Sequence, residues 1–202
     1  MTIRRACWAL LASLLVVVPA RAGLDPTERA LARAVDHRAP AALALLERAV
    51  NVNSGTMNFD GVRKVGRLFQ SELEALGFKV RWVDGAGFGR AGHLIAERSG
   101  RRGGPKVLLI GHLDTVFEAD SPFQKFERLY DSTARGPGVI DMKGGDVIVL
   151  MALGALADAR RLDRLSIRVV LMGDEEKSGA PLTLARRDLF AAADWADVAI
   201  GF

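Results

Sequence analysis

The most constraining feature of this chain is a short apolar run, Val107–Ile110, that leads into two polar residues. Gly104 and Pro105 precede the run, which is too short for a helix of ordinary length. It therefore predicts a central strand with both faces covered. His112 and Asp114 follow two residues apart, so in an extended segment their side chains point the same way. Because ligands of α/β sheets bind at the carboxyl ends of strands, we expect chemistry here.

The pair formed by His112 and Asp114 has two interpretations. A metal-bound imidazole usually donates its other ring proton to a carboxylate, and Asp114 is placed to accept it. Alternatively, the pair is a capped strand end whose histidine is satisfied locally, and the motif alone does not decide between the two. His37 and His93 have no carboxylate at ligand spacing, so we interpret both as structural or surface histidines.

Composition and charge argue for a globular protein and against two kinds of binding partner. The 202 residues suffice for one sizeable domain or for part of a larger one. Half of them are hydrophobic and 26% are charged, a globular balance. The formal net charge of +4 includes Arg4, Arg5 and Arg21, and without these three the 25 remaining basic residues face 24 acidic ones. This balance does not favour nucleic acid or an anionic membrane surface as a partner.

Residues 1–22 have the pattern of a secretory signal peptide. An arginine pair is followed by the apolar stretch Ala6–Val18 and by a cleavage motif at Ala20–Ala22. The stretch is shorter than the ~20 residues that span a bilayer, and an uncleaved anchor is the alternative. We expect a periplasmic or secreted protein that starts at Gly23 and is not attached to a membrane. Cys7 would leave with the signal, so any metal must be held by histidine and carboxylates.

The hydrophobic pattern predicts an α/β fold in which helices flank a mainly parallel sheet. In the second half, strand, helix, strand, helix and strand follow one another, which implies parallel strands with right-handed crossovers. The expected helices cover residues 25–35, 40–50, 58–77, 147–157 and 182–193. The expected strands cover residues 78–83, 93–97, 107–110, 165–172 and 197–201, and residues 117–135 are expected to be irregular.

Two further segments with acidic residues lie next to the predicted strands and helices. Asp141 lies within the glycine-rich segment Gly136–Gly145, just before a strongly apolar helix. A carboxylate there could simply cap the helix, but the glycines allow close backbone approach and argue for a site. Asp174, Glu175 and Glu176 end the second buried strand. Three adjacent carboxylates repel one another unless a cation lies among them.

Together the polar clusters fit a metal site with nitrogen and oxygen ligands. His112, Asp141 and Glu176 would be ligands, and Glu175 would be free to take a proton from a metal-bound water as it attacks a carbonyl. A magnesium–nucleotide site is excluded, because the chain has no glycine-rich phosphate loop that ends in Gly-Lys-Ser/Thr. In the segment Lys143–Gly145 the glycines lie on the wrong side of the lysine.

Three motifs in this order and at this spacing resemble those of the M20 metallopeptidases. They are Gly111–Val116, Gly136–Gly145 and Asp174–Glu176. The resemblance runs from about Leu43 to the end of the chain. That family includes glutamate carboxypeptidases, acetylornithine deacetylases, succinyl-diaminopimelate desuccinylases and aminoacylases. The amino-acid sequence of the first motif is most similar to that of the glutamate carboxypeptidases.

The resemblance implies a two-zinc hydrolase that cleaves a peptide or N-acyl amino-acid bond, with cobalt or manganese as alternative metals. By the same resemblance, His112 binds one zinc and Asp114 supports it. Asp141 bridges both ions, Glu176 binds the second, and Glu175 is the general base. The resemblance further implies a small peptide or N-acyl amino acid as substrate, a homodimer in the full-length relatives, and a cis peptide bond after Asp141.

The chain departs from the family pattern at its carboxyl end. In the family a further acidic ligand, a lid and dimerisation domain, and a distant histidine follow, whereas this sequence ends at Phe202. We therefore expect residues 23–202 to be the amino-terminal part of the catalytic domain, and expect this part alone to be inactive. The alternative function is a catalytically inactive fragment that keeps the fold and at most a weak metal site.

Overall fold

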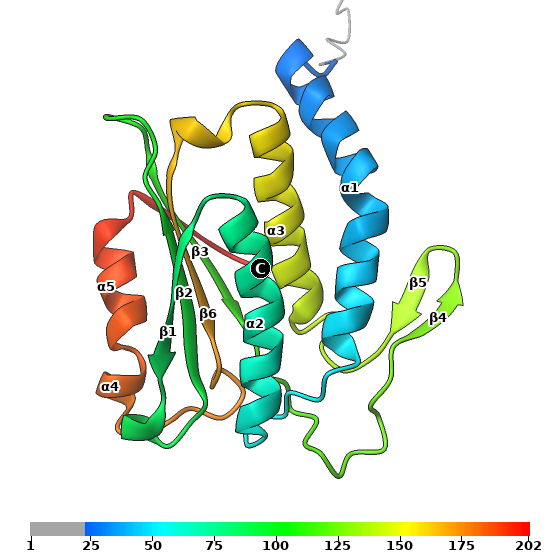
Figure 1. The fold of residues 1–202 in the computed structure, drawn as a ribbon, viewed down its shortest axis with the longest axis vertical. Coiled ribbons are helices and arrows are strands. Elements are labelled where there is room, and N and C mark those ends of the chain that lie inside the picture. Colours follow the sequence, from blue (N-terminus) through cyan, green and yellow to red (C-terminus); the bar gives the residue numbers. More distant parts are fainter. Residues whose placement is uncertain (1–22) are drawn as a thin grey trace, which may run out of the picture.

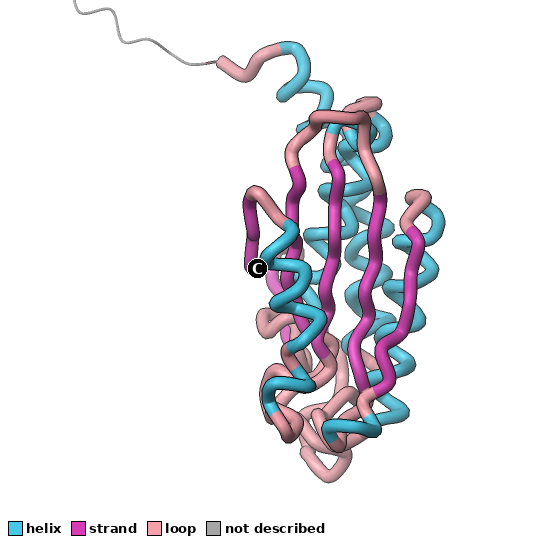
Figure 2. The backbone as a smooth tube through the Cα atoms, turned by 90° about the vertical axis from the view of Figure 1, so that its left-hand side faces the viewer, coloured by secondary structure: helices cyan, strands magenta, loops and turns pink. Residues whose placement is uncertain are grey.

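The computed structural model describes residues 23–202, and the expected signal peptide lies outside the described residues. One five-stranded sheet lies between two layers of helices (Figure 1). Of the three long helices, two cover one face of the sheet and the first in the chain packs outside them, whereas the two short helices cover the other face, which is in front in Figure 2. The predicted fold class, an α/β fold with helices on a sheet, is confirmed, but the sheet is mixed where a mainly parallel one was expected.

The sheet is mixed, with the strand order β1-β2-β6-β3-β7. β3 pairs in parallel with both β6 and β7, as the alternation of strands and helices predicts. β1 and β2 are antiparallel to each other because only a short loop and no crossover helix joins them. β2 is also antiparallel to β6. The strands are β1 Lys79–Asp84, β2 Gly92–Arg98, β3 Lys106–His112, β6 Ser166–Met172 and β7 Val198–Gly201.

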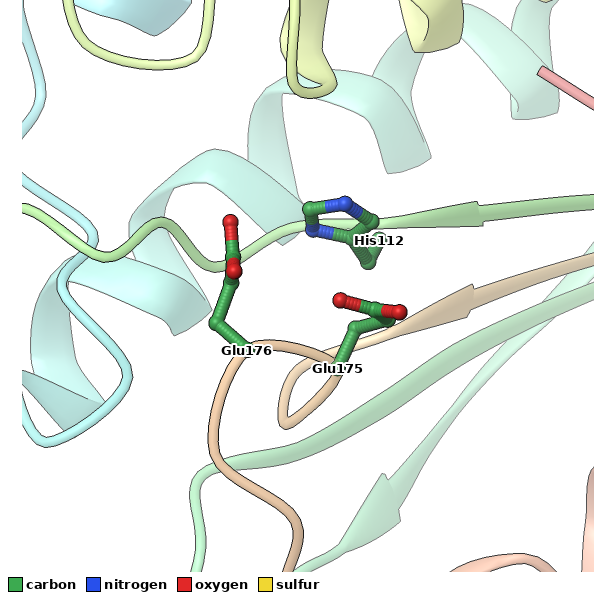
Figure 3. Close-up of side chains that lie close together, drawn as sticks. All are labelled: His112, Glu175 and Glu176. Atoms are coloured by element: carbon green, nitrogen blue, oxygen red, sulfur yellow. The ribbon is translucent and has the colours of Figure 1, made fainter.

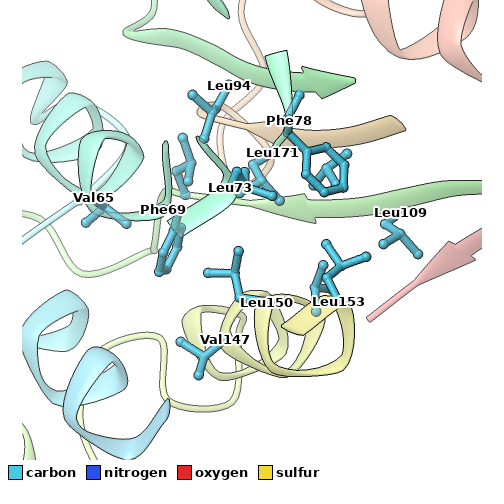
Figure 4. Close-up of a cluster of buried hydrophobic side chains, with 14 of the residues drawn as sticks. Val65, Phe69, Leu73, Phe78, Leu94, Leu109, Val147, Leu150, Leu153 and Leu171 are labelled. Carbon is cyan, nitrogen blue, oxygen red and sulfur yellow. The ribbon is translucent and has the colours of Figure 1, made fainter. Parts of the chain in front are cut away.

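The helices pack on the sheet through two apolar layers. α2 Phe59–Ala75 and α3 Lys143–Asp158 lie on one face, with α1 Pro26–Val50 packed against α3, and α4 Leu182–Ala185 and α5 Arg187–Trp195 lie on the other face. Alternate residues of a strand face opposite sides, so Leu109 joins the larger core and Leu108 the smaller one. Figure 4 shows the larger core, in which Phe69 and Leu73 of α2 meet side chains of the sheet and of α3.

α1 is one continuous helix, whereas the sequence predicted a break before Pro40. The expected start is correct, because Asp25 and Glu28 form a reciprocal capping box around Pro26. Pro40 removes one backbone hydrogen bond. Contacts on both sides of the proline offset this loss, since Arg38 forms two hydrogen bonds to Asp158 of α3 and the residues after Pro40 enter the core.

Two other segments differ from the predicted elements. The region expected to be irregular contains a hairpin of β4 Glu127–Tyr130 and β5 Thr133–Arg135, which forms a separate two-stranded sheet. The helix expected at residues 182–193 is divided at Arg186, whose side chain reaches back to the loop after β6. Short 3-10 turns lie at η1 Ala86–Phe88 and η2 Leu162–Arg164. Within residues 23–202, no helix is both long and apolar enough to cross a membrane.

Candidate metal centre

The predicted site residues gather at one edge of the sheet. β3 and β6 are parallel and in register, with His112 opposite Met172, so both strands end at the same edge. Asp114 follows β3 by two residues, and Glu175 lies in the loop that follows β6. Asp141 comes two residues before α3 and reaches the same edge, where it contacts His112. The fold thus joins residues that are separated by up to about sixty positions in the sequence.

Three of these side chains form a compact group of metal-binding donors. One ligand atom from each of His112, Glu175 and Glu176 lies within 4.8 Å of the other two, and Figure 3 shows the side chains around a common space. Asp141 is next to this group, because Asp141 Oδ1 lies 2.9 Å from His112 Nε2. His112 is buried, whereas the Asp141 side chain is 71% exposed. The roles of Glu175 as base and of Asp141 as ligand stay predictions.

Asp114 connects His112 to the acidic residues. Its backbone carbonyl lies 3.0 Å from His112 Nδ1, and its carboxylate lies 3.5 Å from the same nitrogen. Because a carbonyl oxygen only accepts, Nδ1 carries the proton and Nε2 is the atom available to a metal. The carboxylate is fully buried and accepts hydrogen bonds from Thr56 Oγ1 at 2.7 Å and from the backbone N–H groups of Glu175 and Glu176 at 3.1 and 3.2 Å.

The crowding of acids around a buried imidazole shifts two pKa values. Burial lowers the pKa of His112, but the carboxylates of Asp114 and Asp141 outweigh burial and raise this pKa to about 9. Burial and the nearby charge of Asp141 raise the pKa of Glu176. Without a metal, His112 is therefore protonated at neutral pH, and this proton supplies positive charge where the carboxylates favour a cation.

Comparisons with known proteins identify the family of this chain. The sequence pattern of peptidase family M20/M25/M40 matches residues 108–201. Carboxypeptidase G2 from Pseudomonas sp. (strain RS-16) is 33% identical over 204 aligned residues, which cover 98% of this chain and 46% of that protein. The chain belongs to the M20 peptidase family. It spans about half the length of this relative.

Other proteins match shorter parts of the sequence or the fold alone. A succinyl-diaminopimelate desuccinylase from Gluconacetobacter diazotrophicus is 36% identical over 110 residues, which cover 52% of this chain and 28% of that protein. Human carnosine dipeptidase 1 shares the fold with a TM-score of 0.72 at 19% identity, over 86% of this chain and 40% of that one. The M20 metallo-carboxypeptidase Sso-CP2 from Sulfolobus solfataricus has a TM-score of 0.62 at 17% identity. The match covers 79% of this chain and 36% of that one.

The M20 motif around Asp141 has the backbone form that the resemblance implies. The peptide bond between Asp141 and Met142 is cis. Beyond it, Lys143 begins α3, is fully buried, and donates from Nζ to the backbone carbonyl of Val52 at 2.9 Å. Burial lowers the pKa of Lys143 to about 8. This lysine ties the segment that carries Asp141 to the loop between α1 and α2, a role that its sequence neighbours do not indicate.

The loop between Gly173 and Gly179, here called the acidic loop, is held by two arginines that sequence reasoning missed. Arg186 donates to Asp174 Oδ1 at 2.6 Å, and Asp174 is fully buried. Arg90 donates to two backbone carbonyls of the loop at 2.7 and 2.8 Å. Asp174 is therefore an anchor of the loop. These partners lie 12 and nearly 90 positions from the loop residues they hold, so no local pattern could reveal them.

A third buried acid, after Asp114 and Asp174, lies beneath the centre. Asp146 in the first turn of α3 is fully buried, and neither carboxylate oxygen has a hydrogen-bond partner among residues 23–202. Burial raises the pKa of Asp146 well above its usual value. Gly111 of β3 is required by this close approach, because a Cβ added there would lie 2.2 Å from Asp146 Oδ1. The sequence of the motif Gly111–Val116 did not predict this contact between Gly111 and Asp146.

The other two histidines are structural or exposed, as predicted. His93 is buried with both ring nitrogens satisfied, since Nε2 lies 2.9 Å from the carbonyl of Ala185 and Nδ1 accepts from the N–H of Gly173 at 3.1 Å. Burial lowers the pKa of His93, which keeps the ring neutral. His37 lies on the exposed side of α1. Neither residue belongs to the metal-binding group found among the described residues.

Proposed function

We propose that this chain provides metal-binding and proton-transfer residues of a hydrolase that cleaves a peptide or N-acyl amino-acid bond. The observation that carries the proposal is the convergence of His112, Glu175 and Glu176 within 4.8 Å in a chain of the M20 family. Asp141 lies against the same imidazole at 2.9 Å and supplies a fourth donor.

The donor set fits the metals of the proposal. One imidazole and several carboxylates suit zinc, with cobalt or manganese as alternatives, and the described residues contain no cysteine that would offer a thiolate. The proposed ligands are His112 for one zinc, Glu176 for a second, and Asp141 as the bridge between them. The proton on His112 Nδ1, held by the carbonyl of Asp114, leaves Nε2 free for a metal.

Metal ions held by these residues would supply polarisation of the substrate carbonyl and a lower pKa of the attacking water. Glu175 accepts the proton of that water and passes it to the leaving amine. Its side chain is exposed, so substrate and water can reach it. Its backbone N–H is held by Asp114 at 3.1 Å, which limits the positions that its carboxylate can take.

The similarity to carboxypeptidase G2 supports release of a carboxy-terminal residue such as glutamate as the finer proposal. This chain spans 46% of that relative. We further propose a periplasmic or secreted homodimer. The alternative is an inactive chain with at most a weak metal site.

Replacing Asp141 with alanine should abolish the zinc binding that the unmodified chain shows, because a bridging carboxylate serves both ions. Zinc titration by calorimetry measures this. Asp194→Ala, on the exposed side of α5, is the matched control and should bind zinc like the unmodified chain. Zinc affinity that is unchanged in Asp141→Ala would exclude Asp141 from the ligand set.

Hydrolysis is tested in a joined enzyme, in which this chain is fused to the part of carboxypeptidase G2 that has no counterpart here. The assay measures glutamate released from an N-acyl-glutamate with zinc present. Release that depends on zinc and on Asp141 supports the proposal. Zinc binding by the chain without any release from the joined enzyme favours the inactive alternative.

Zinc binding to the metal-free chain at pH 7 should release about one proton from His112. The raised pKa of about 9 keeps this imidazole protonated at pH 7, and only the neutral ring binds a metal. Zinc affinity should therefore rise as the pH approaches 9, by about tenfold per pH unit, and level off above it. Calorimetry in two buffers of different ionisation enthalpy counts the protons, and a heat that is independent of the buffer would contradict the prediction.

A further inference from the structure

The acidic loop carries Glu175 and Glu176, whose side chains are shown in Figure 3, and its outer side is held by side chains that are far from it in the sequence. We propose that His93 and Arg186 act together as positioning residues, which hold these two glutamates in place before a metal binds. This inference rests on the proposed function, because it concerns the same centre, and it assigns a role there to two residues that bind no metal themselves.

Arg186 closes the acidic loop at its base. Its guanidinium donates to Asp174 Oδ1 at 2.6 Å, to the backbone carbonyl of Asp174 at 3.2 Å and to Ser178 Oγ at 2.7 Å. Asp174 Oδ2 accepts from the backbone N–H of Gly179 at 2.8 Å. Asp174 is fully buried and the Arg186 side chain is 14% exposed, so water screens this ion pair only weakly. The two ends of the loop are thereby tied together.

His93 fixes the backbone next to both members of this ion pair. Its Nδ1 accepts from the N–H of Gly173, the residue before the acid, at 3.1 Å. Its Nε2 lies 2.9 Å from the carbonyl of Ala185, the residue before the arginine, and donates to it in the neutral ring. Phe88 stacks on the imidazole with ring centroids 4.9 Å apart and 16° between the planes. One imidazole therefore sets where β6 ends and where α4 ends relative to each other.

The inner side of the loop is held by the centre itself. The backbone N–H groups of Glu175 and Glu176 donate to the carboxylate of Asp114 at 3.1 and 3.2 Å. These bonds and those of Arg186 use no carboxylate oxygen of either glutamate, so the oxygens stay available to a metal. A loop that is fixed from both sides loses little entropy when its carboxylates bind an ion.

The charges of the loop explain why it needs bonds on its outer side. Burial and the nearby charges of Asp141 and Glu175 raise the pKa of Glu176, which shows that these carboxylates repel one another. Repulsion favours a loop that moves away from the centre. Arg90 opposes this movement together with Arg186, because it donates to two backbone carbonyls of the loop at 2.7 and 2.8 Å.

The geometry at Arg186 requires a guanidinium and is not met by positive charge alone. Three acceptors on two residues, Asp174 and Ser178, are reached by the two terminal nitrogens of one planar group. A lysine ammonium is a compact point charge and cannot span the same acceptors. Arg186→Lys therefore keeps the charge and removes the fork, which separates positioning from electrostatic attraction.

The test measures hydrogen exchange of backbone amides by NMR in the metal-free chain, and zinc affinity by calorimetry. Arg186→Lys and His93→Phe, which keeps an aromatic ring on Phe88, should each speed exchange at the Glu175 and Glu176 amides about tenfold. Zinc affinity should fall about 10–100-fold in both variants. Arg187→Lys is the matched control, since this neighbouring arginine is 65% exposed and pairs with Asp188, and it should change neither quantity.

The amides of Leu109 and Val169, which lie opposite each other in β3 and β6, report on the core. Exchange that rises equally there would show a general loss of stability and would overturn the inference. Unchanged exchange at the two glutamates, or faster exchange with unchanged zinc affinity, would overturn it as well.

Two further results keep the test decisive. If His93→Phe does not fold, Arg186→Lys and Ser178→Ala decide, and Ser178→Ala, which removes one of the three acceptors, should speed exchange at the two glutamates about threefold. A chain that binds no zinc sinks the proposed metal centre, whereas the exchange rates are measured without metal and still decide whether His93 and Arg186 hold the loop.

Discussion

Replacing Glu175 with glutamine should lower the turnover of the joined enzyme about 10²–10⁴-fold, the usual contribution of a positioned general base. Glutamine keeps the shape of the side chain and cannot accept the proton of the attacking water. The backbone hydrogen bond from Glu175 to Asp114 does not involve the altered group, so the loop should keep its position. Metal content should therefore remain as in the unmodified protein, and metal analysis beside the kinetic assay checks both quantities.

The same experiment decides between two roles of Glu175. Its ligand atom lies within 4.8 Å of those of His112 and Glu176, so the alternative is that Glu175 itself binds a metal. A metal ligand would lose metal and turnover together when changed to glutamine, whereas a base would lose turnover alone. Glu47→Gln, on the exposed side of α1, is the matched control. Near-normal turnover with full metal would remove Glu175 from both roles.

Replacing Asp114 with alanine should destabilise the metal-free chain by about 3–5 kcal/mol. The carboxylate is fully buried and accepts three hydrogen bonds, so its loss leaves Thr56 Oγ1 and two backbone N–H groups without an acceptor. The buried and protonated His112 would also lose its nearest buried carboxylate. Zinc affinity should fall by about 10–100-fold as well, because the groups that orient the ligands are lost.

Urea denaturation measures the stability of Asp114→Ala, and calorimetry measures its zinc affinity. Thr56→Val removes only one of the three donors and should cost about 1 kcal/mol, which makes it a graded control. A change of less than about 1 kcal/mol for Asp114→Ala would show that water replaces the carboxylate without loss. The account of Asp114 as the connection between His112 and the acidic loop would then be wrong.

The sheet and most helices follow from local sequence pattern. The run Val107–Ile110 has the period and length of a buried strand, and the structure contains it within β3. α2 begins after its predicted cap at Asn58, and the chain turns at Gly77, whose φ of 81° suits glycine. These features depend on residues a few positions apart, which is why the sequence is sufficient to predict them.

The continuity of α1 and the division at Arg186 depend on distant partners. Arg38 and Asp158 lie 120 positions apart, and their hydrogen bonds help to hold the helix together across Pro40. Arg186 lies 12 positions from Asp174, and its pairing coincides with the end of α4. Local propensity favours a break in the first case and a longer helix in the second. Tertiary contacts override it in both: the residues after Pro40 pack into the core, and Arg186 pairs with the buried Asp174.

For the site, the sequence by itself determined which side chains could do the chemistry. A histidine and acids at the ends of predicted parallel strands must meet at one sheet edge, and His112, Asp141, Glu175 and Glu176 do so. Only the tertiary structure decided what holds them there. Thr56 reaches Asp114 across 58 positions, and Arg90 holds the acidic loop across 87. The physical reason is that strand direction follows from local order, whereas these hydrogen bonds depend on which distant segments the folded chain brings together.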